Sequence, residues 1–405
     1  MAVENHLLDV GVMFAAVATM GLVADRLDQS VIPFYILIGM LLGPHVLGQI
    51  GLPFVEETTF VEIGAELGIV FLLFFLGLEF NLDRLIESKD RIGKAGTIDL
   101  VVNFGAGLVL GYAVFGTLLS ALLIAGIVYI SSSAIITKSL IDLGWVANRE
   151  SDPMLGTLVY EDLFIAVYLS VVSALVLGGG DVGEALESVG VAMGFILVLL
   201  LVVYFGTAWF ERALHTQSNE FFVLRVIGIT VLVAGAALAA GVSEAVAAFF
   251  IGMGFSSTNY VDELEHNLEA IRDTFAAVFF FWIGLVTDPL LFPAVAGLVA
   301  LAVLLTTPTK LASGFLAGRV YGLDERRSTR VGLGMVTRGE FSLIIATVAV
   351  GGAGVTLPET TANTIQAFAV GYVLVMSILG TTLMRYSSVF EERVVARLSN
   401  DPAGT

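Results

Sequence analysis

Residues 155–177 read LGTLVYEDLFIAVYLSVVSALVL, a stretch long enough to span a bilayer, in which Glu161 and Asp162 are the only charged residues. A carboxylate at the centre of a bilayer costs about 2.5–3.5 kcal/mol on insertion scales, so such residues usually face a bundle interior or a water pathway. The adjacent acids therefore predict a membrane-embedded site that binds an ion or a proton.

The composition predicts an all-α polytopic membrane protein. The chain has 405 residues, of which 57% are hydrophobic and 14% charged, and its mean hydropathy is +0.93. We expect residues 1–390 to form one transmembrane domain and residues 391–405 a short cytoplasmic tail. The net charge of −18 argues against nucleic acid as a partner. With no cysteine and four scattered histidines, the sequence predicts no thiolate metal site and no cofactor.

Apolar stretches of suitable length predict about thirteen transmembrane helices. Their approximate ranges are 7–24, 31–50, 62–81, 95–118, 121–143, 153–177, 185–210, 219–240, 241–258, 267–286, 290–318, 328–351 and 360–386. All of the 19 Lys and Arg residues except Lys310 and Arg338 fall at alternate connections or the span ends beside them. Because Lys and Arg concentrate on the cytoplasmic side, this predicts a cell-membrane protein with its N-terminus outside and its C-terminus in the cytoplasm.

An odd number of spans allows two inverted six-helix repeats joined by a linker helix, as in many secondary transporters. The fifth and twelfth spans then correspond, and both have polar interruptions. The interruptions are Ser131, Ser132 and Ser133 in one span and Thr337, Arg338, Gly339 and Glu340 in the other. Broken helices at matching positions of two halves point to a binding site near the middle of the membrane.

Depth along the helices brings charged residues to one level. At 1.5 Å per residue, Asp162 lies about 15 Å and Lys310 about 13–14 Å from the cytoplasmic ends of their spans, which predicts an ion pair between them. Glu340 also comes to about 15 Å and is expected to lie next to the site. Arg338, Thr337, Asp99 and Asn103 are further expected neighbours, with Arg338 and Glu340 fixing helix ends and Asp99 and Asn103 neutralising them.

The residue types suggest how exchange works. A carboxylate beside backbone carbonyls and hydroxyls coordinates a dehydrated monovalent cation or takes a proton, but hardly both, so one site with two exclusive occupants makes an exchanger. Asp162 is the predicted shared site. Ser131, Ser132 and Ser133 are predicted ligands, with close helix packing as the alternative. Glu161 is either a second ion ligand or a structural hydrogen-bonding group.

Six motifs give the chain a family resemblance. They are GAELGIVFLLFFLGLEFNLDRL at 64–85, SSSAIITKSLIDLG at 131–144, YEDLFIAVYL at 160–169, GVSEAVAAFFIGM at 241–253, FFFWIGLVTDP at 279–289 and RGEFSLIIA at 338–346. In this order and spacing, the chain resembles the membrane domain of the monovalent cation:proton antiporter-2 family, which includes Kef-type potassium/proton and related sodium/proton antiporters.

The resemblance implies a homodimer in which a core domain moves against a dimerisation domain. We expect the core helices at about 95–177 and 290–386 and the dimerisation helices at about 7–81 and 219–286. Asp162 matches the family's essential aspartate, which places Na⁺ or K⁺ at Asp162, and Lys310 matches its basic residue. The cytoplasmic nucleotide-binding domain typical of Kef systems is absent from this sequence, which leaves a separate regulatory subunit as a further partner.

Two other transport functions fit the same polar midplane. A cation channel is one, and a sodium-coupled solute symporter of similar fold is the other. An enzyme is not expected, because the sequence shows no paired serine and histidine for a serine protease.

Overall fold

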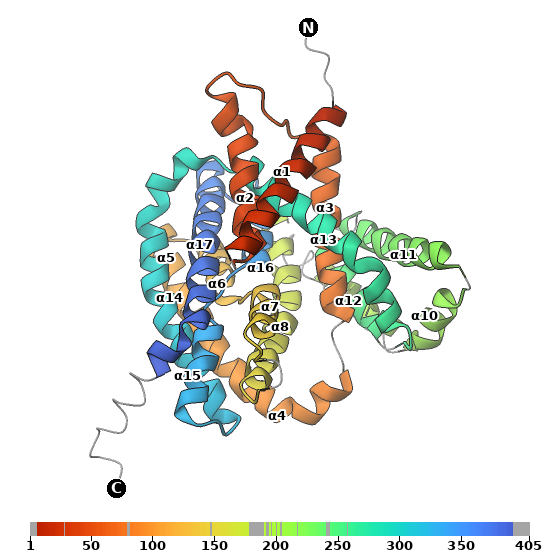
Figure 1. Ribbon diagram of the computed structural model, residues 1–405, viewed down its shortest axis with the longest axis vertical. Helices are drawn as coiled ribbons and strands as arrows, with labels where there is room; N and C mark the ends of the chain where they lie inside the picture. Colours follow the sequence, from red (N-terminus) through yellow and green to blue (C-terminus); the bar gives the residue numbers. More distant parts are fainter. Residues whose placement is uncertain are drawn as a thin grey trace.

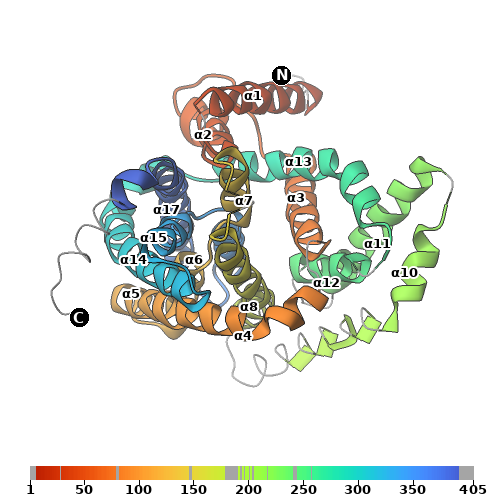
Figure 2. The ribbon, with the colours of Figure 1, turned by 60° about the horizontal axis from the view of Figure 1, so that its bottom comes forward.

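The computed structural model describes residues 6–391 except 28, 79–81, 146–147, 178–189, 192–193, 196, 200, 203–204, 217, 240–243 and 257. Within this part of the chain the named elements are all helical (Figure 1). In both ribbon views α7 and α8 lie between a group containing α14, α15 and α17 and a group containing α3, α12 and α13 (Figure 2). The helices that carry the predicted site residues therefore meet at the centre of the molecule.

The first half of the chain contains α1 (His6–Arg26), α2 (Val31–Leu42), the π-helix η1 (Pro44–Gly48), α3 (Thr59–Leu78), α4 (Leu82–Asp99), the π-helix η2 (Leu100–Phe104), α5 (Gly105–Phe115), α6 (Leu118–Tyr129), α7 (Ser133–Asp142) and α8 (Ser151–Leu177). The second half contains α10 (Thr207–Leu214), α11 (Asn219–Ala239), α12 (Glu244–Ser256), α13 (Val261–Leu285), the 3₁₀-helix η3 (Pro289–Leu291), α14 (Phe292–Val320), α15 (Glu325–Gly334), α16 (Glu340–Gly351) and α17 (Glu359–Arg385).

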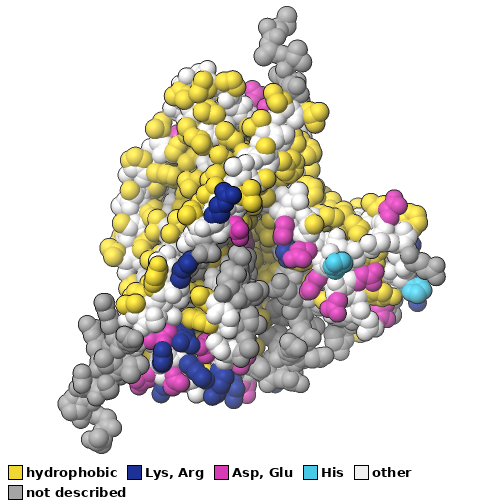
Figure 3. Space-filling view, in the orientation of Figure 1, with side chains coloured by type: hydrophobic (Ala, Val, Ile, Leu, Met, Phe, Trp, Pro, Cys, Tyr) yellow, Lys and Arg dark blue, Asp and Glu magenta, His cyan; other side chains and the backbone are white. Residues whose placement is uncertain are grey.

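The helices agree with the predicted spans over most of the chain. Among the described residues, 8 helices are long and apolar enough to cross a membrane, and the shorter apolar helices include α6, α12 and α16. The structure describes the predicted span at 185–210 only in part. Each other predicted range overlaps one of these helices, except 267–286, which overlaps α13, a helix with several charged residues in its first half. Hydrophobic side chains cover much of the face shown in Figure 3, while many Lys and Arg side chains gather at its lower end, near α15. This distribution is that of a multi-pass membrane protein.

Reciprocal glycine contacts pack two pairs of helices backbone to backbone. A Cβ atom on Gly39 of α2 would overlap the Phe281 carbonyl of α13, and one on Gly284 of α13 would overlap the Ile36 carbonyl of α2. Gly77 of α3 and Gly252 of α12 make the same reciprocal contact with the Phe249 and Phe74 carbonyls. Exchanging α2 with α12 and α3 with α13 converts one pair into the other, as two inverted repeats require.

We expect Gly252→Ala to destabilise the protein by about 1–3 kcal/mol, because its methyl group has no room beside α3 and overpacking costs energy of this size. Gly235→Ala on α11 is the matched control, since a Cβ there meets nothing within 4 Å. Thermal unfolding of both variants in one detergent measures the difference. Equal melting temperatures for the two variants would contradict the close backbone contact.

A π-turn in one long helix and a proline within another lie at corresponding places. The π-helix η2 separates α4 from α5, begins directly after Asp99 and contains Asn103, and Pro308 lies inside α14, two residues before Lys310. Proline removes a main-chain hydrogen bond, and single π-turns occur frequently at functional sites. Both features therefore place polar side chains at the centre of the protein.

Candidate functional site

Two broken helices cross at the centre of the protein. Residues 130–132 separate α6 from α7, and residues 335–339 separate α15 from α16. The Ser132 N–H donates to the Thr337 carbonyl over 3.3 Å, so the two unwound segments are bonded to each other. A Cβ on Gly339 would overlap the Ser132 side chain. The two interruptions predicted from the sequence are confirmed.

Arg338 binds the carbonyl ends of both interrupted helices. Its Nε donates to the Val128 carbonyl at 3.0 Å, and its Nη1 donates to the carbonyls of Met335, Val336 and Thr337 at 2.8–3.1 Å. The Arg338 side chain is fully buried. A helix ends in unpaired carbonyls that carry partial negative charge, so one guanidinium stabilises the ends of α6 and α15 together.

Glu340 has the complementary place at the opposite helix ends. It is the first residue of α16, and it accepts hydrogen bonds from Ser132 Oγ at 2.8 Å and Ser133 Oγ at 3.3 Å, where α7 begins. A carboxylate at two helix N-termini is electrostatically favourable. Glu340 and Arg338 therefore have the helix-end role that we expected, and Thr337 contributes through its backbone carbonyl.

Glu161 is bound to the first interruption. Its Oε2 accepts the Ser131 N–H at 2.6 Å, and its Oε1 accepts the Ser131 hydroxyl at 3.0 Å. The side chain of Glu161 is fully buried. These contacts support the structural alternative for Glu161, and they show that each serine predicted as a cation ligand donates its hydroxyl to a carboxylate.

Lys310 lies between two carboxylates. Its Nζ atom is 2.7 Å from Asp99 Oδ2 and 2.7 Å from Glu161 Oε1, and all three side chains are buried. The predicted ion pair between Lys310 and Asp162 is not formed among the described residues, so that prediction is wrong. Depth along a helix fixes the level of a side chain but not its direction, and consecutive helical residues point about 100° apart. Lys310 is at the predicted level but faces Glu161.

Asp99 and Asn103 have a more direct role than predicted. Asp99 pairs with Lys310 itself, and its Oδ1 accepts hydrogen bonds from Ser313 Oγ at 2.7 Å and Asn103 Nδ2 at 2.9 Å. Lys310 Nζ also lies 5.1 Å from the centre of the Tyr129 ring, within cation–π range. The sequence reasoning missed Ser313 and Tyr129, although Ser313 is one helical turn after Lys310.

The three buried carboxylates Asp99, Glu161 and Asp162 differ in whether they bind Lys310. Lys310 is held by Asp99 and Glu161 together, and several hydrogen bonds compensate part of the cost of burying these charges. Asp162, 4% exposed, lies on α8 directly after Glu161, so its backbone is at the level of the interruption that Glu161 binds. The arrangement places a buried carboxylate, backbone carbonyls and serine hydroxyls in the same region of the protein.

A second charge cluster anchors α15 at the end remote from the crossing. Glu391, which follows α17, accepts hydrogen bonds from Arg326 Nε at 2.5 Å and Arg330 Nε at 2.7 Å. Arg330 also donates to Glu150, just before α8, at 2.6 Å. Residue 391, the first residue of the expected short cytoplasmic tail, has a buried side chain. These contacts tie α15 to the start of α8 and the end of α17.

We expect Glu391→Gln to lower the unfolding free energy by about 1 kcal/mol at neutral pH, because the two arginines lose a charged acceptor. Burial raises the pKa of Glu391, but the hydrogen bonds from Arg330 and Arg326 outweigh this and hold the pKa below its usual value. A lowered pKa gives stability above the unfolded pKa of about 4.3, and this is lost as the pH falls through the folded pKa. Melting curves of wild type and variant should therefore differ at neutral pH and converge once the pH falls below the folded pKa of Glu391. A constant difference at all pH values would contradict this.

Comparisons with known proteins agree with this arrangement. The "Sodium/hydrogen exchanger, transmembrane" family model matches residues 12–386. The "K(+)/H(+) antiporter subunit KhtU" of Bacillus subtilis (strain 168) is 38% identical over 387 residues, covering 95% of this chain and 94% of that protein. The "Ammonium/H(+) antiporter subunit AmhT" of Alkalihalophilus pseudofirmus is 29% identical over 388 residues, covering 94% of this chain and 93% of that protein.

A similar fold is found in the sodium proton antiporter MjNhaP1 from Methanocaldococcus jannaschii. Its structure at pH 8 has a TM-score of 0.72 and 17% sequence identity, and the match covers 96% of this chain and 99% of that chain. At this identity the likeness shows the fold alone. The family match and the 38% identical relative identify the chain as a cation/proton antiporter. The chain belongs to the transmembrane sodium/hydrogen exchanger family, and the predicted family resemblance and exchange activity are confirmed.

Proposed function

We propose that Asp162 is the site at which a monovalent cation and a proton bind in turn. The observation that supports this most is the position of Asp162, buried in α8 beside the crossing of the broken helices. Lys310 forms its ion pairs with Asp99 and Glu161, and not with Asp162. A carboxylate buried in a membrane exchanges a proton for a cation more readily than it stays charged and unbound.

The ligands of the cation follow from the same position. Carboxylate oxygen of Asp162, together with backbone carbonyls and serine oxygens of the interruption at 130–132, supplies the hard oxygen donors that alkali cations prefer. Glu161 and Lys310 hold this interruption in place, because Glu161 binds both the N–H and the hydroxyl of Ser131. In this proposal they position the site and Asp162 carries the exchange.

Transport proceeds by alternating access between two units. The mobile unit comprises the core helices at about 95–177 and 290–386, and the stationary unit comprises the dimerisation helices at about 7–81 and 219–286. The glycine-packed pairs α2/α13 and α3/α12 all belong to the stationary unit, which supports its behaviour as one rigid body. We further propose a homodimer in the cell membrane, with the N-terminus outside and the C-terminus in the cytoplasm.

K⁺ is the cation to test first, because the relative with 38% identity is named a K⁺/H⁺ antiporter subunit. Na⁺ and NH₄⁺ are the competitors, since other relatives are named for these ions. The word subunit in two of the names also supports a separate regulatory partner for this chain.

The test is proton flux in proteoliposomes that contain the purified protein. We expect lumenal pH to change when K⁺ is added, and the dependence on a clamped membrane potential to report the charge moved per cycle. Current without obligatory counter-flux would instead identify a channel, and flux that needs an organic solute would identify a symporter. Silence with K⁺, Na⁺ and NH₄⁺ in folded protein would contradict exchange by this chain alone and direct the test to a regulatory partner.

A further inference from the structure

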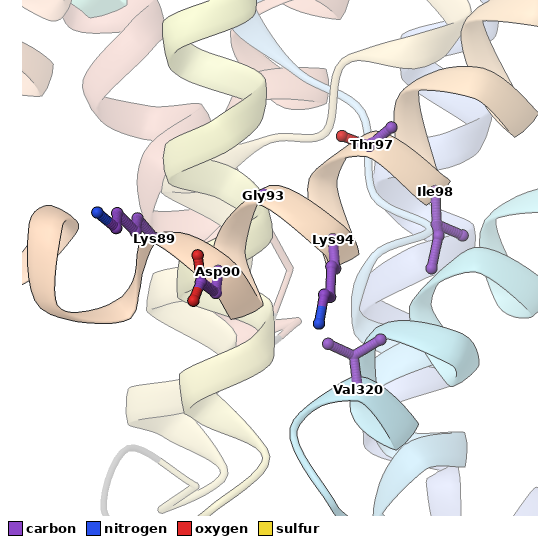
Figure 4. Close-up of a pocket in the computed structure, with 7 residues that line it drawn as sticks. All are labelled: Lys89, Asp90, Gly93, Lys94, Thr97, Ile98 and Val320. Atoms are coloured by element: carbon purple, nitrogen blue, oxygen red, sulfur yellow. The ribbon is translucent and has the colours of Figure 1, made fainter.

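A groove on α4 lies outside the exchange site. It is a cavity of about 590 Å³ between α4 and the C-terminal end of α14. Its lining residues are Lys89, Asp90, Gly93, Lys94, Thr97 and Ile98 of α4 and Val320 of α14 (Figure 4). The α4 residues repeat at intervals of four, so the groove runs along one face of the helix.

The groove lies where α4 enters the membrane. From residue 95 to residue 115 the only charged side chain is the buried Asp99, whereas Lys89 and Lys94 precede this apolar stretch. Lysines at such a boundary lie at the level of the lipid headgroups. Figure 2 shows α4 along the outer edge of the ribbon, which is the position of a helix that lipid can reach.

The lining of the groove combines positive charge with an apolar floor. Lys89 and Lys94 outnumber the acidic Asp90, while Ile98 and Val320 provide the apolar contacts. A Cβ on Gly93 would meet nothing within 4 Å, so the middle of this face is open. Two ammonium groups repel the cations that the protein exchanges, so the groove is not a route for them.

We propose that this groove binds the headgroup of an anionic phospholipid, with Lys89 and Lys94 attracting its phosphate and Ile98 and Val320 contacting the start of an acyl chain. The positive charge of the groove favours an anionic ligand. The apolar floor of the groove, at the membrane boundary, favours a lipid over a soluble anion. Basic pockets between transmembrane helices on the cytoplasmic side bind anionic headgroups by the same chemistry.

The first test uses the purified full-length protein in detergent with phosphatidylglycerol or phosphatidylcholine added. Native mass spectrometry counts the lipids retained, and thermal unfolding reports stabilisation. We expect wild type to retain phosphatidylglycerol preferentially. The variant Lys89→Gln/Lys94→Gln should bind it about 30-fold more weakly, since each basic residue near an anionic surface contributes about 1 kcal/mol. Asp90→Asn should change binding in the opposite direction.

A steric variant separates occupancy of the groove from charge alone. Gly93→Leu places a bulky apolar side chain on the open face, where a Cβ meets nothing within 4 Å, and should abolish preferential retention, whereas Gly105→Leu, whose Cβ also meets nothing within 4 Å, should not. Equal retention of the two lipids by wild type, or unchanged retention in all the groove variants, would overturn the proposal. Stabilisation by inorganic phosphate as strong as that by phosphatidylglycerol would overturn the lipid as ligand and assign the site to a soluble anion.

Discussion

Asp162→Asn should abolish cation-driven proton flux in proteoliposomes while leaving the protein folded. Asparagine keeps the size of the side chain but carries neither the negative charge that binds a cation nor a group that takes up a proton near neutral pH. Both half-reactions at the proposed site are lost together, so the expected effect is complete loss and not a shift in pH optimum. Stability should fall little, because the substitution removes a buried charge and introduces none.

The matched control is Asp152→Asn, the same substitution in the first turn of the same helix, where the side chain is exposed. This variant should exchange at the wild-type rate. Size-exclusion profiles and melting curves of both variants establish that loss of flux is not loss of fold. Normal exchange by Asp162→Asn would refute Asp162 as the shared site and move the proposal to Glu161 or Asp99.

Lys310→Met should destabilise the protein by about 3–5 kcal/mol, because it leaves two buried carboxylates without their common cation. Asp99 and Glu161 both lie 2.7 Å from the ammonium nitrogen, and neither has access to water. We expect a large fall in melting temperature and poor recovery from the membrane. Thermal unfolding in detergent, with melting followed at several protein concentrations, measures the change.

A charge-balanced variant distinguishes this explanation from a simple loss of packing. Lys310→Met combined with Asp99→Asn and Glu161→Gln removes all three charges and keeps side chains of similar size, so most of the lost stability should return. If the triple variant is no more stable than Lys310→Met alone, the ion pairs are not the cause. If the triple variant still exchanges protons for cations, Asp162 is sufficient for the chemistry and Lys310 acts only in stability.

The architecture could be predicted because its signals are local. Serine, threonine, arginine and glutamate inside apolar stretches mark the two broken helices, and the acids in residues 155–177 mark the centre of the protein. The direction in which a side chain points within the helix bundle has no such local signal in the sequence. The partner of Lys310 depends on the rotation of α8 about its own axis and on η2, which turns Asp99 inward, and neither follows from depth along a helix.

Contacts between segments that are far apart in the chain could not be predicted from the sequence either. In the sequence Glu391 is one acid of a polar tail, and only the fold shows that α15 brings Arg326 and Arg330 to it. The reciprocal glycines are visible in the sequence, but only the packing of α2 on α13 and α3 on α12 shows which carbonyl each one approaches. Long-range pairing of this kind is a property of the tertiary fold.

Arg338 holds the crossing through main-chain oxygens of Val128, Met335, Val336 and Thr337. Every residue offers such an oxygen, whatever its side chain. Substitutions along these unwound segments therefore leave the acceptors of Arg338 in place as long as the backbone keeps its path. An evolving lineage is then free to alter the side chains around Asp162, the proposed exchange site, without rebuilding the framework that brings the helices together.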